Sequence, residues 1–477
     1  MEAVNCQELT FTYPLAAEPS LQAVSFSVRQ GEICLLTGRS AAGKSTLLKL
    51  LKKEIAPAGT VTGTVQVSGM VGYVSQHIEE SLVCDRVRSE LSFGLTNLGR
   101  TADEIALATA EIASYFHLEN KLDCPLSELS GGEKQLVNLA AVMVIQPSIL
   151  LRDEPCAQLD PVAAERFLQA VERLNRDFRC TVLLSEHSLP AVFEMADSVL
   201  LLEEGRLLYA GEKEAVVREL LQKEPVLRAL LPVQYRVALA PTATADQPTT
   251  VDGDVALQAK HLYFAYERGN DVLRDLSLRV FRGKINAVIG ANGCGKSTLL
   301  KVLSGIKKPY RGKCKTTGRV AMLTQNVYDL FTQDRCADEV PFGALTDFLS
   351  ISHLAERHPY DLSGGEAQRL ALAKVLAREA DLILLDEPTK GLDALLKRKL
   401  AHLLRQLCQQ GKTVLLVSHD LDFVGEVADA VSFMSRGNVL STGTAPSVFR
   451  SLRFYTTSLA RLTDGKITAL RDDCDEA

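Results

Sequence analysis

The sequence of 477 residues lacks the long apolar segment that a membrane-spanning helix requires, since no hydrophobic run approaches ~18 residues. It also lacks an export signal, because Met1-Glu2-Ala3 begins no signal peptide. We therefore expect a chain that is cytosolic by itself.

Disulfide and zinc-site patterns are lacking as well, because the 11 cysteines include no C-x-x-C pair. Reduced intracellular thiols are expected in place of a disulfide framework or a metal cluster. An excess of basic residues is also missing, since 53 Lys and Arg against 59 Asp and Glu give a net charge of -6. This balance argues against a nucleic-acid-binding surface as the main function.

The most informative pattern that the chain does contain is the phosphate-binding sequence G-x-x-x-x-G-K-S-T, at residues 38–46 and again at 290–298. Its glycines let backbone N–H groups curl around an anionic phosphate at the start of a helix. A glycine-rich turn before a helix is the simpler alternative. Both copies, however, follow an apolar strand, at residues 33–36 and 285–289, and open an apolar helix. The repeated context favours two nucleotide sites.

Each phosphate-binding copy supplies ligands for a nucleotide and for Mg²⁺. Lys44 and Lys296 are expected to reach the β- and γ-phosphates, while Ser45 and Ser297 place a hydroxyl on the metal. The residues predicted to bind ATP here are Gly38, Arg39, Ser40, Ala41, Ala42, Gly43, Lys44, Ser45 and Thr46, and Gly290, Ala291, Asn292, Gly293, Cys294, Gly295, Lys296, Ser297 and Thr298.

Further along each half, an apolar strand ends in adjacent acids, at residues 148–154 and 382–387. A buried parallel strand explains the apolar run, and its carboxyl end is where α/β sheets hold ligands. A solvated strand end is the alternative for either copy alone. Paired with the phosphate loops, the acids are expected to hold Mg²⁺ and to orient the attacking water. The predicted metal ligands are Asp153 and Asp386, and the predicted catalytic residues are Glu154 and Glu387.

Leu-Ser-Gly-Gly-Glu segments occur at residues 129–133 and 362–366. Such a segment can be an ordinary capped helix start, and a capped start can also bind a γ-phosphate. With these segments the chain resembles the ATP-binding cassette (ABC) ATPases over essentially the whole of both halves. The resemblance implies that two cassettes meet head to tail, with each ATP between a phosphate loop and the opposite Ser-Gly-Gly. The residues concerned are Ser130, Gly131 and Gly132, which work with Lys296, and Ser363, Gly364 and Gly365, which work with Lys44.

Smaller elements of the ABC family match one residue at a time and in the same order in both halves. Each of them is a weak signal alone, but the repeated order supports the resemblance. They are Gln76 and Gln325 at the glutamine-loop position of the metal site, His187 and His419 at the position of the catalytic switch histidine, and Tyr13 and Tyr266 where an aromatic ring stacks on adenine.

The repeat predicts two α/β domains in tandem, each with a RecA-like core and a helical signature subdomain. We expect the first ABC ATPase domain at residues 1–237, a flexible linker at 238–255, the second domain at 256–450 and a C-terminal extension with an acidic tail at 451–477. Between glutamine loop and signature the second half is 16 residues shorter, because the offset falls from 249 (325 − 76) to 233 (363 − 130). The two halves are therefore not expected to grip their partners identically.

A finer resemblance lies after the first glutamine, where residues 87–97 read V-x-x-E-x-x-F-G-x-x-N, echoed at 338–343. This stretch is similar to the ATPases of energy-coupling factor (ECF) vitamin importers, although the proline usual there is missing. The resemblance implies two partners, a transmembrane coupling protein and a substrate-capture membrane protein, and a peripheral position on the cytoplasmic face of the cell membrane. The candidate docking acids, for which a solvated surface is the alternative, are Glu79, Glu80, Asp329 and Asp334.

Other classes of ABC protein remain as alternatives. The tandem ATPase of a sugar-type importer usually has halves of unequal catalytic completeness, whereas both sets are present here. A soluble translation-associated ABC protein would carry a long charged helical linker, but this linker is short and slightly acidic. A DNA-repair type would need zinc-ligand clusters or coiled-coil insertions, which the sequence does not contain.

Arg152 departs from the family pattern, because it replaces the apolar residue usual before the metal-binding aspartate. The strand there should be buried, where an unpaired charge is costly. Either a nearby acid forms a structural ion pair with Arg152, or the arginine weakens the first site. We favour the ion pair, since the rest of the site is intact.

Overall fold

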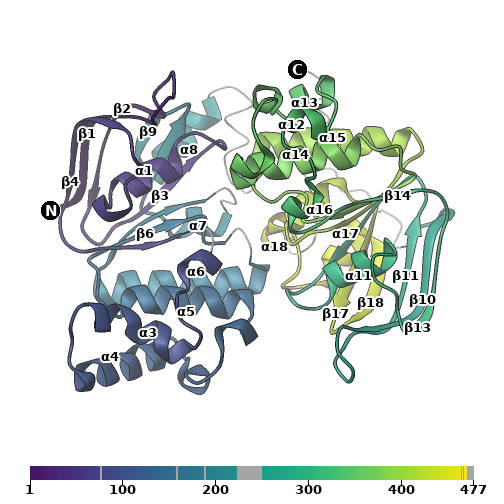
Figure 1. The fold of residues 1–477 in the computed structure, drawn as a ribbon, viewed down its shortest axis with the longest axis horizontal. Helices are drawn as coiled ribbons and strands as arrows, with labels where there is room; N and C mark the ends of the chain where they lie inside the picture. The colour runs from purple at the N-terminus through teal and green to yellow at the C-terminus, as the bar shows by residue number, and fades with distance from the viewer. Residues whose placement is uncertain are drawn as a thin grey trace. The chain divides into compact units, whose positions relative to one another are not determined.

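The computed structural model describes residues 1–75, 78–156, 159–186, 190–222, 250–463, 465 and 467–469. The chain divides into two compact units, Met1–Tyr235 and Arg236–Ala477, which we call the first and second cassette. Each cassette contains a six-stranded, mostly parallel sheet and a three-stranded antiparallel sheet (Figure 1). The predicted fold class, α/β with two cassettes in tandem, is therefore confirmed.

In the first cassette the six-stranded order is β5-β6-β7-β3-β8-β9 and the antiparallel order is β2-β1-β4. The strands are β1 (Glu2–Thr12), β2 (Leu21–Arg29), β3 (Ile33–Gly38), β4 (Thr60–Val67), β5 (Val71–Val74), β6 (Ile149–Asp153), β7 (Thr181–Ser185), β8 (Ser198–Glu203) and β9 (Arg206–Glu212). The helices are α1 (Lys44–Leu50), α2 (Ile78–Ser81), α3 (Val87–Asn97), α4 (Ala102–Tyr115), α5 (Gly131–Met143), α6 (Pro161–Phe178), α7 (Pro190–Met195) and α8 (Lys213–Gln222), with 3-10 turns η1 (Lys53–Ile55), η2 (Glu119–Lys121) and η3 (Leu126–Glu128).

The second cassette repeats this plan, with the orders β14-β15-β16-β12-β17-β18 and β11-β10-β13. The strands are β10 (Val255–Ala265), β11 (Asp271–Phe281), β12 (Ile285–Ile289), β13 (Arg311–Thr316), β14 (Val320–Leu323), β15 (Leu382–Asp386), β16 (Thr413–Val417), β17 (Ala430–Ser435) and β18 (Asn438–Thr444). The helices are α11 (Lys296–Leu303), α12 (Cys336–Glu339), α13 (Ala344–Phe348), α14 (Gly364–Leu376), α15 (Ala394–Gln409), α16 (Leu421–Val427), α17 (Ala445–Ser451) and α18 (Ser458–Leu462), with 3-10 turns η4 (Val327–Leu330), η5 (Ser352–Leu354) and η6 (Pro359–Asp361).

Hydrophobic side chains cover both faces of each parallel sheet. In β3, Ile33 and Leu35 pack with residues of α5 and α6, whereas Cys34 and Leu36 pack with residues of α1 and the antiparallel sheet. Figure 1 shows α3 to α6 on one side of this sheet and α1 with β1, β2 and β4 on the other. Burial on both faces explains why the central strands read as continuous apolar runs.

The helical part that precedes the signature helix, the helix that starts with Gly-Gly-Glu (α5 or α14), differs between the cassettes. The first contains α3 and the 14-residue α4, which starts with a capping box between Thr101 and Glu104. At the same place the second has only the 4-residue α12 and the 5-residue α13 before short turns. The 16 residues missing from the second half are therefore missing from this helical part.

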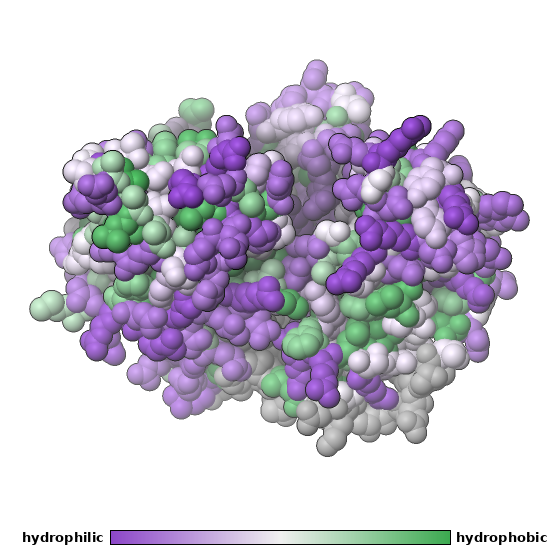
Figure 2. Space-filling model, turned by 90° about the horizontal axis from the view of Figure 1, so that it is seen from below, coloured by the Kyte–Doolittle hydropathy of each residue, from purple (hydrophilic) through white to green (hydrophobic). Residues whose placement is uncertain are grey.

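Within the described ranges, no helix is both long enough and apolar enough to cross a membrane. On the face drawn in Figure 2, hydrophilic side chains prevail and hydrophobic ones form only small patches. The predicted acidic tail and most of the predicted linker lie outside the described residues.

Candidate functional site

Each phosphate-binding loop connects a central strand to a helix, β3 to α1 and β12 to α11. Lys44 Nζ donates to the carbonyl oxygens of Gly38 and Arg39, at 3.1 and 2.9 Å. Lys296 makes the same two contacts in the second loop, at 2.8 and 2.9 Å. Both lysines are buried, and Ser45 and Ser297 follow them in the first helical turn. The lysine ammonium groups are thus held by backbone carbonyl oxygens of the two loops.

The first glycine of each loop is required by close backbone packing. A Cβ atom on Gly38 would lie 2.0 Å from the carbonyl oxygen of Leu202, and one on Gly290 would lie 2.1 Å from that of Met434. Both glycines also have positive φ, 146° and 153°. The loop backbone can therefore take this path only with glycine at these two positions.

The aromatic residues predicted to stack on adenine lie beside the same helices. The Tyr13 hydroxyl is 3.0 Å from the hydroxyl of Thr46, and the Tyr266 hydroxyl is 3.3 Å from that of Thr298. The two tyrosines are 37% and 55% exposed. Each tyrosine is therefore partly exposed next to the phosphate loop.

In the second cassette the two acids at the end of β15 have different surroundings. Asp386 is buried, and neither of its carboxylate oxygens has a hydrogen-bond partner among the described residues. Burial raises the pKa of Asp386 to about 6, although the nearby Ser297 hydroxyl and Lys296 oppose the shift. A buried carboxylate without a partner is the kind of group that a divalent cation satisfies.

Glu387 contacts the predicted switch histidine. His419 Nδ1 lies 2.9 Å from one carboxylate oxygen of Glu387, and the His419 backbone N–H donates to the other at 3.2 Å. Burial lowers the pKa of His419, but the charge and hydrogen bond of Glu387 outweigh it, so the pKa is raised. The structure thus brings together the two predicted catalytic residues of this cassette. Gln325 is exposed beyond the end of β14.

In the first cassette Asp153 is fixed by a hydrogen bond that the second lacks. The hydroxyl of Ser185 donates to Asp153 at 2.6 Å and accepts from the backbone N–H of Glu154 at 3.1 Å. The second cassette has Val417 at the position of Ser185. His187 and Gln76 lie outside the described residues.

Both glutamates predicted to be catalytic have left-handed backbone conformations, with φ of 46° for Glu154 and 52° for Glu387. Such a conformation costs ~1–3 kcal/mol for a residue other than glycine. Strained residues of this kind persist where the surrounding structure holds them, most often at functional sites. The two glutamates therefore share one backbone conformation at matching positions of the two cassettes.

The two Leu-Ser-Gly-Gly-Glu segments form capped starts of 13-residue helices, α5 and α14. The Glu133 carboxylate accepts from the Ser130 backbone N–H at 2.9 Å, and the Ser130 hydroxyl accepts from the Glu133 N–H at 3.3 Å. Ser363 and Glu366 repeat this box. Both serines are exposed, so the first turns present backbone N–H groups at the surface.

Comparison with known proteins agrees with this geometry. A family model described as "ABC transporter" matches residues 21–157 and 273–390, one stretch in each cassette. The chain belongs to the ABC transporter ATPase family. Its cassettes are therefore ATP-binding domains whose activity is ATP hydrolysis.

Relatives of similar length carry matching names. A Bacillus anthracis protein named "Putative ABC transporter ATP-binding protein" is 37% identical over 95% of this chain and 94% of its own length. Proteins of the same name from Clostridium tetani and Methanosarcina acetivorans are each 30% identical, over 79% and 94% of this chain and 96% and 87% of their own lengths.

Solved structures with the same fold include tandem ABC proteins. RNase-L inhibitor has a TM-score of 0.66 at 21% identity, over 93% of this chain and 92% of that one. An archaeal ribosome recycling factor, solved with a ribosomal stalk protein, has a TM-score of 0.65 at 23% identity, over 93% and 91%. At this identity the likeness shows the shared fold alone.

A buried glutamate fixes the loop after the predicted glutamine loop in each ABC cassette. Glu90 accepts from two consecutive backbone N–H groups, those of Val83 and Cys84, at 3.0 and 2.8 Å. Glu339 accepts from the corresponding pair in the second cassette and from Lys374 of the signature helix α14. Sequence reasoning gave these glutamates no role, although both halves repeat Asp-Arg-x-x-x-Glu at residues 85–90 and 334–339.

Arg152 is not in the expected ion pair. Its guanidinium is fully buried, donates to the side-chain oxygen of Gln135 and lies 4.6 Å from the centre of the Phe167 ring. Among the described residues no carboxylate lies within ion-pair distance, and Nε and Nη1 have no hydrogen-bond partner. The expected ion pair is therefore not formed among the described residues: an amide and an aromatic face on two helices contact the guanidinium, while the charge of Glu186 acts on it from beyond ion-pair distance.

Proposed function

We propose that this ABC ATPase powers an importer of the energy-coupling factor type, which takes up a vitamin or another small nutrient through separate membrane subunits. The observation that carries the proposal is the loop fixed by Glu90 and by Glu339. Glu90 is the glutamate of the V-x-x-E-x-x-F-G-x-x-N pattern by which the chain resembles these importers. The names of the relatives support a transporter role.

The same proposal assigns both ATP sites within one chain. The phosphate loop of Lys44 works with the segment that begins at Ser363, and the loop of Lys296 works with the segment that begins at Ser130. Tyr13 and Tyr266 stack on the adenine rings. Two exposed, capped helix starts and two glycine-dependent loops supply the four half-sites that this pairing needs.

The chemistry that these residues can perform is hydrolysis by a positioned water. Mg²⁺, when bound, neutralises phosphate charge, and Ser297 with the buried Asp386 would hold it in the second cassette, as Ser45 with Asp153 would in the first. Glu387, which lies 2.9 Å from His419, would orient and polarise the attacking water.

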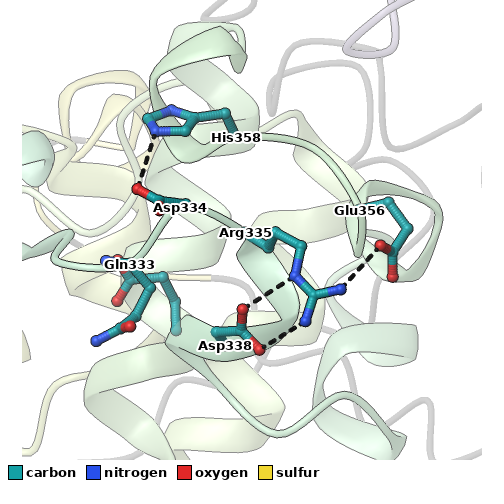
Figure 3. Close-up of polar contacts among 7 residues, drawn as sticks. Gln333, Asp334, Arg335, Asp338, Glu356 and His358 are labelled. Atoms are coloured by element: carbon teal, nitrogen blue, oxygen red, sulfur yellow. Dashed lines mark hydrogen bonds and ion pairs between the residues drawn. The ribbon is translucent and has the colours of Figure 1, made fainter.

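The proposed docking surface of the second cassette is the exposed polar cluster drawn in Figure 3. Asp334 is fully exposed, and His358 lies 3.8 Å from it. The neighbouring Arg335 pairs with Asp338 at 3.0 Å and with Glu356 at 3.2 Å, which holds the surface in one arrangement. In importers of this type the cytoplasmic helices of the coupling protein carry basic residues, so exposed Asp334 is a suitable contact.

The test is affinity purification of the full-length chain from detergent-solubilised membranes of its own cells. We expect a coupling protein and small substrate-capture membrane proteins to copurify, and nutrient uptake to depend on the chain. The double variant Asp329→Asn, Asp334→Asn should reduce their recovery. Glu379→Gln, which changes an exposed acid paired with Arg319 outside the segment, is the matched control. Recovery of ribosomes and no membrane protein would overturn the proposal.

A further inference from the structure

Two glutamines at matching positions of the signature helices, Gln135 in α5 and Gln368 in α14, make different contacts at the carboxyl ends of strands β6 and β15. In the second cassette Gln368 Nε2 of α14 donates to the backbone carbonyl of Glu387, at 3.2 Å. In the first cassette Gln135 occupies the same position of α5 and is 1% exposed, but its oxygen accepts from Arg152. The signature helix thus reaches the catalytic glutamate directly in one cassette, and reaches the residue two positions before it in the other.

Arg152 is built into this connection as a rigid, buried cation. It is 0% exposed and lies between Gln135 of α5 and the ring of Phe167 of α6. Burial lowers its pKa to about 10, so the side chain stays charged at neutral pH. The second cassette has Leu385 and Leu400 where the first has Arg152 and Phe167. A packed cation and ring therefore replace a pair of leucines.

A second buried charge accompanies the arginine. Glu186, immediately after β7, is 2% exposed and accepts from the backbone N–H of Cys156 at 2.7 Å. The second cassette has Ser418 at this position, whose hydroxyl lies 3.5 Å from that of Thr389. Strands β6 and β7 are neighbours, so both charges lie at the strand ends next to Glu154. In the first cassette, two buried charges that the second cassette lacks therefore lie against the segment that carries Glu154.

We propose that Arg152 is a positioning residue of the first ATP site. Its guanidinium ties Gln135 of the signature helix to the strand end that carries Asp153 and Glu154. A shift of α5 is thereby transmitted to Glu154 through the arginine, whereas a shift of α14 acts on Glu387 through its own carbonyl.

A consequence rests on the proposed function, under which the start of α5 contacts the nucleotide held by Lys296. Occupancy of the Lys296 site would then set the position of Glu154 through Gln135 and Arg152. The two sites would respond to each other through unlike connections and turn over at unequal rates.

The experiment measures turnover at the Lys44 site in the full chain, with the other site made inactive but still nucleotide-binding by Glu387→Gln. The double variant Arg152→Leu, Glu186→Ser removes both buried charges and installs the second-cassette residues. The single variant Gln135→Met keeps both charges and removes only the acceptor. We expect each to lower kcat about tenfold, equal to ~1.4 kcal/mol of barrier, with KM for ATP within twofold of the parent. The triple variant should be no slower than the double.

The control is Arg173→Leu, because Arg173 is also an arginine over a ring, 3.8 Å from the centre of Tyr115, but lies outside the connection. It should lower the melting temperature without lowering kcat. Turnover of the double variant within twofold of the parent would mean that Arg152 only neutralises Glu186, and would overturn the proposal. If the double variant does not fold, Gln135→Met decides alone by the same criterion. None of these outcomes alters the copurification result that tests the importer proposal.

Discussion

At the scale of single residues, the two aspartates predicted to bind the metal have unlike neighbours although their strands are alike. Ser185 holds Asp153 by a 2.6 Å hydrogen bond, while Asp386 has no partner among the described residues and has a raised pKa of about 6. Without a bound cation, burial therefore makes Asp386 costly to keep charged. The adjacent glutamates share one strained backbone conformation.

Replacing both glutamates should remove most of the ATPase activity. The double variant Glu154→Gln, Glu387→Gln keeps the size of each side chain but removes the carboxylate that orients water. We expect steady-state turnover to fall by ~10²–10⁴, the usual contribution of a positioned general base. Unchanged turnover, with melting temperature and ATP binding retained, would exclude both residues from the mechanism.

The phosphate loop should not tolerate a methyl group at its first glycine. In Gly38→Ala the new Cβ would be 2.0 Å from the Leu202 carbonyl oxygen, so the loop must shift. We expect ATP affinity at that site to fall about tenfold or more, measured by equilibrium binding in the Lys296→Ala background. Gly343→Ala, where an added Cβ meets nothing within 4 Å, is the control. Equal ATP affinity of the Gly38→Ala and Gly343→Ala variants would show that the loop can shift without losing ATP.

At the scale of elements, one buried carboxylate in each cassette, Glu90 or Glu339, fixes the loop that follows the predicted glutamine loop. Glu339 joins that loop to the signature helix by accepting from two loop N–H groups and from Lys374, which also donates to the Leu330 carbonyl at 2.7 Å. The loop and α14 should therefore move together. A partner bound to the loop would thus act on the helix that starts at Ser363.

The contribution of Glu339 to stability should depend on pH. Burial raises its pKa, but Lys374 and the two loop N–H groups outweigh burial and lower it below the ordinary 4.5. The unfolded chain therefore takes up this proton first, and the stabilisation is present above pH ~4.5 and lost as pH falls through the folded pKa. We expect Glu339→Gln to cost ~1–3 kcal/mol at pH 7, with the difference shrinking in acid, by urea unfolding. Glu379→Gln should show little effect at either pH, and a pH-independent cost for Glu339→Gln would contradict the assignment.

At the scale of the whole molecule, the chain contains two cassettes that share one plan but differ in two places. The second has lost most of the helical part that α3 and α4 form in the first. The first alone contains the buried Arg152 and Glu186. These differences lie in the parts that would contact a partner and in the parts that hold a catalytic glutamate.

The proposed pairing of sites predicts a defect in trans. Ser130 is exposed at the start of α5, so the Ser130→Arg variant can fold. Under the proposed pairing, its bulky side chain would occupy the place of the γ-phosphate of the opposite nucleotide. We expect trapping at the Lys296 site to fall about tenfold or more, assigned by photo-crosslinking and proteolysis. Ser127→Arg, an exposed serine three residues earlier, is the control. A defect confined to the Lys44 site would show that the pairing is wrong.

Much of this architecture is determined by local sequence. The glycine loops, the apolar strands that end in Asp-Glu and the Ser-Gly-Gly-Glu helix starts follow from residues within about one turn or one strand of each other, so their patterns predict them. The same holds for the shorter helical part of the second half, which a count of residues between motifs revealed. The fold class followed from the repetition of these patterns.

Only the tertiary structure decided which groups meet in the interior. Arg152 and Gln135 are 17 positions apart, and Glu339 and Lys374 are 35 apart, so no local pattern pairs them. The sequence led to an acid partner for Arg152, because a buried charge is expected to be neutralised by its opposite. The packing of α5 and α6 against β6 brought the amide of Gln135 and the ring of Phe167 to Arg152 instead. The partner of a buried group is therefore set by which side chains the fold brings within contact distance.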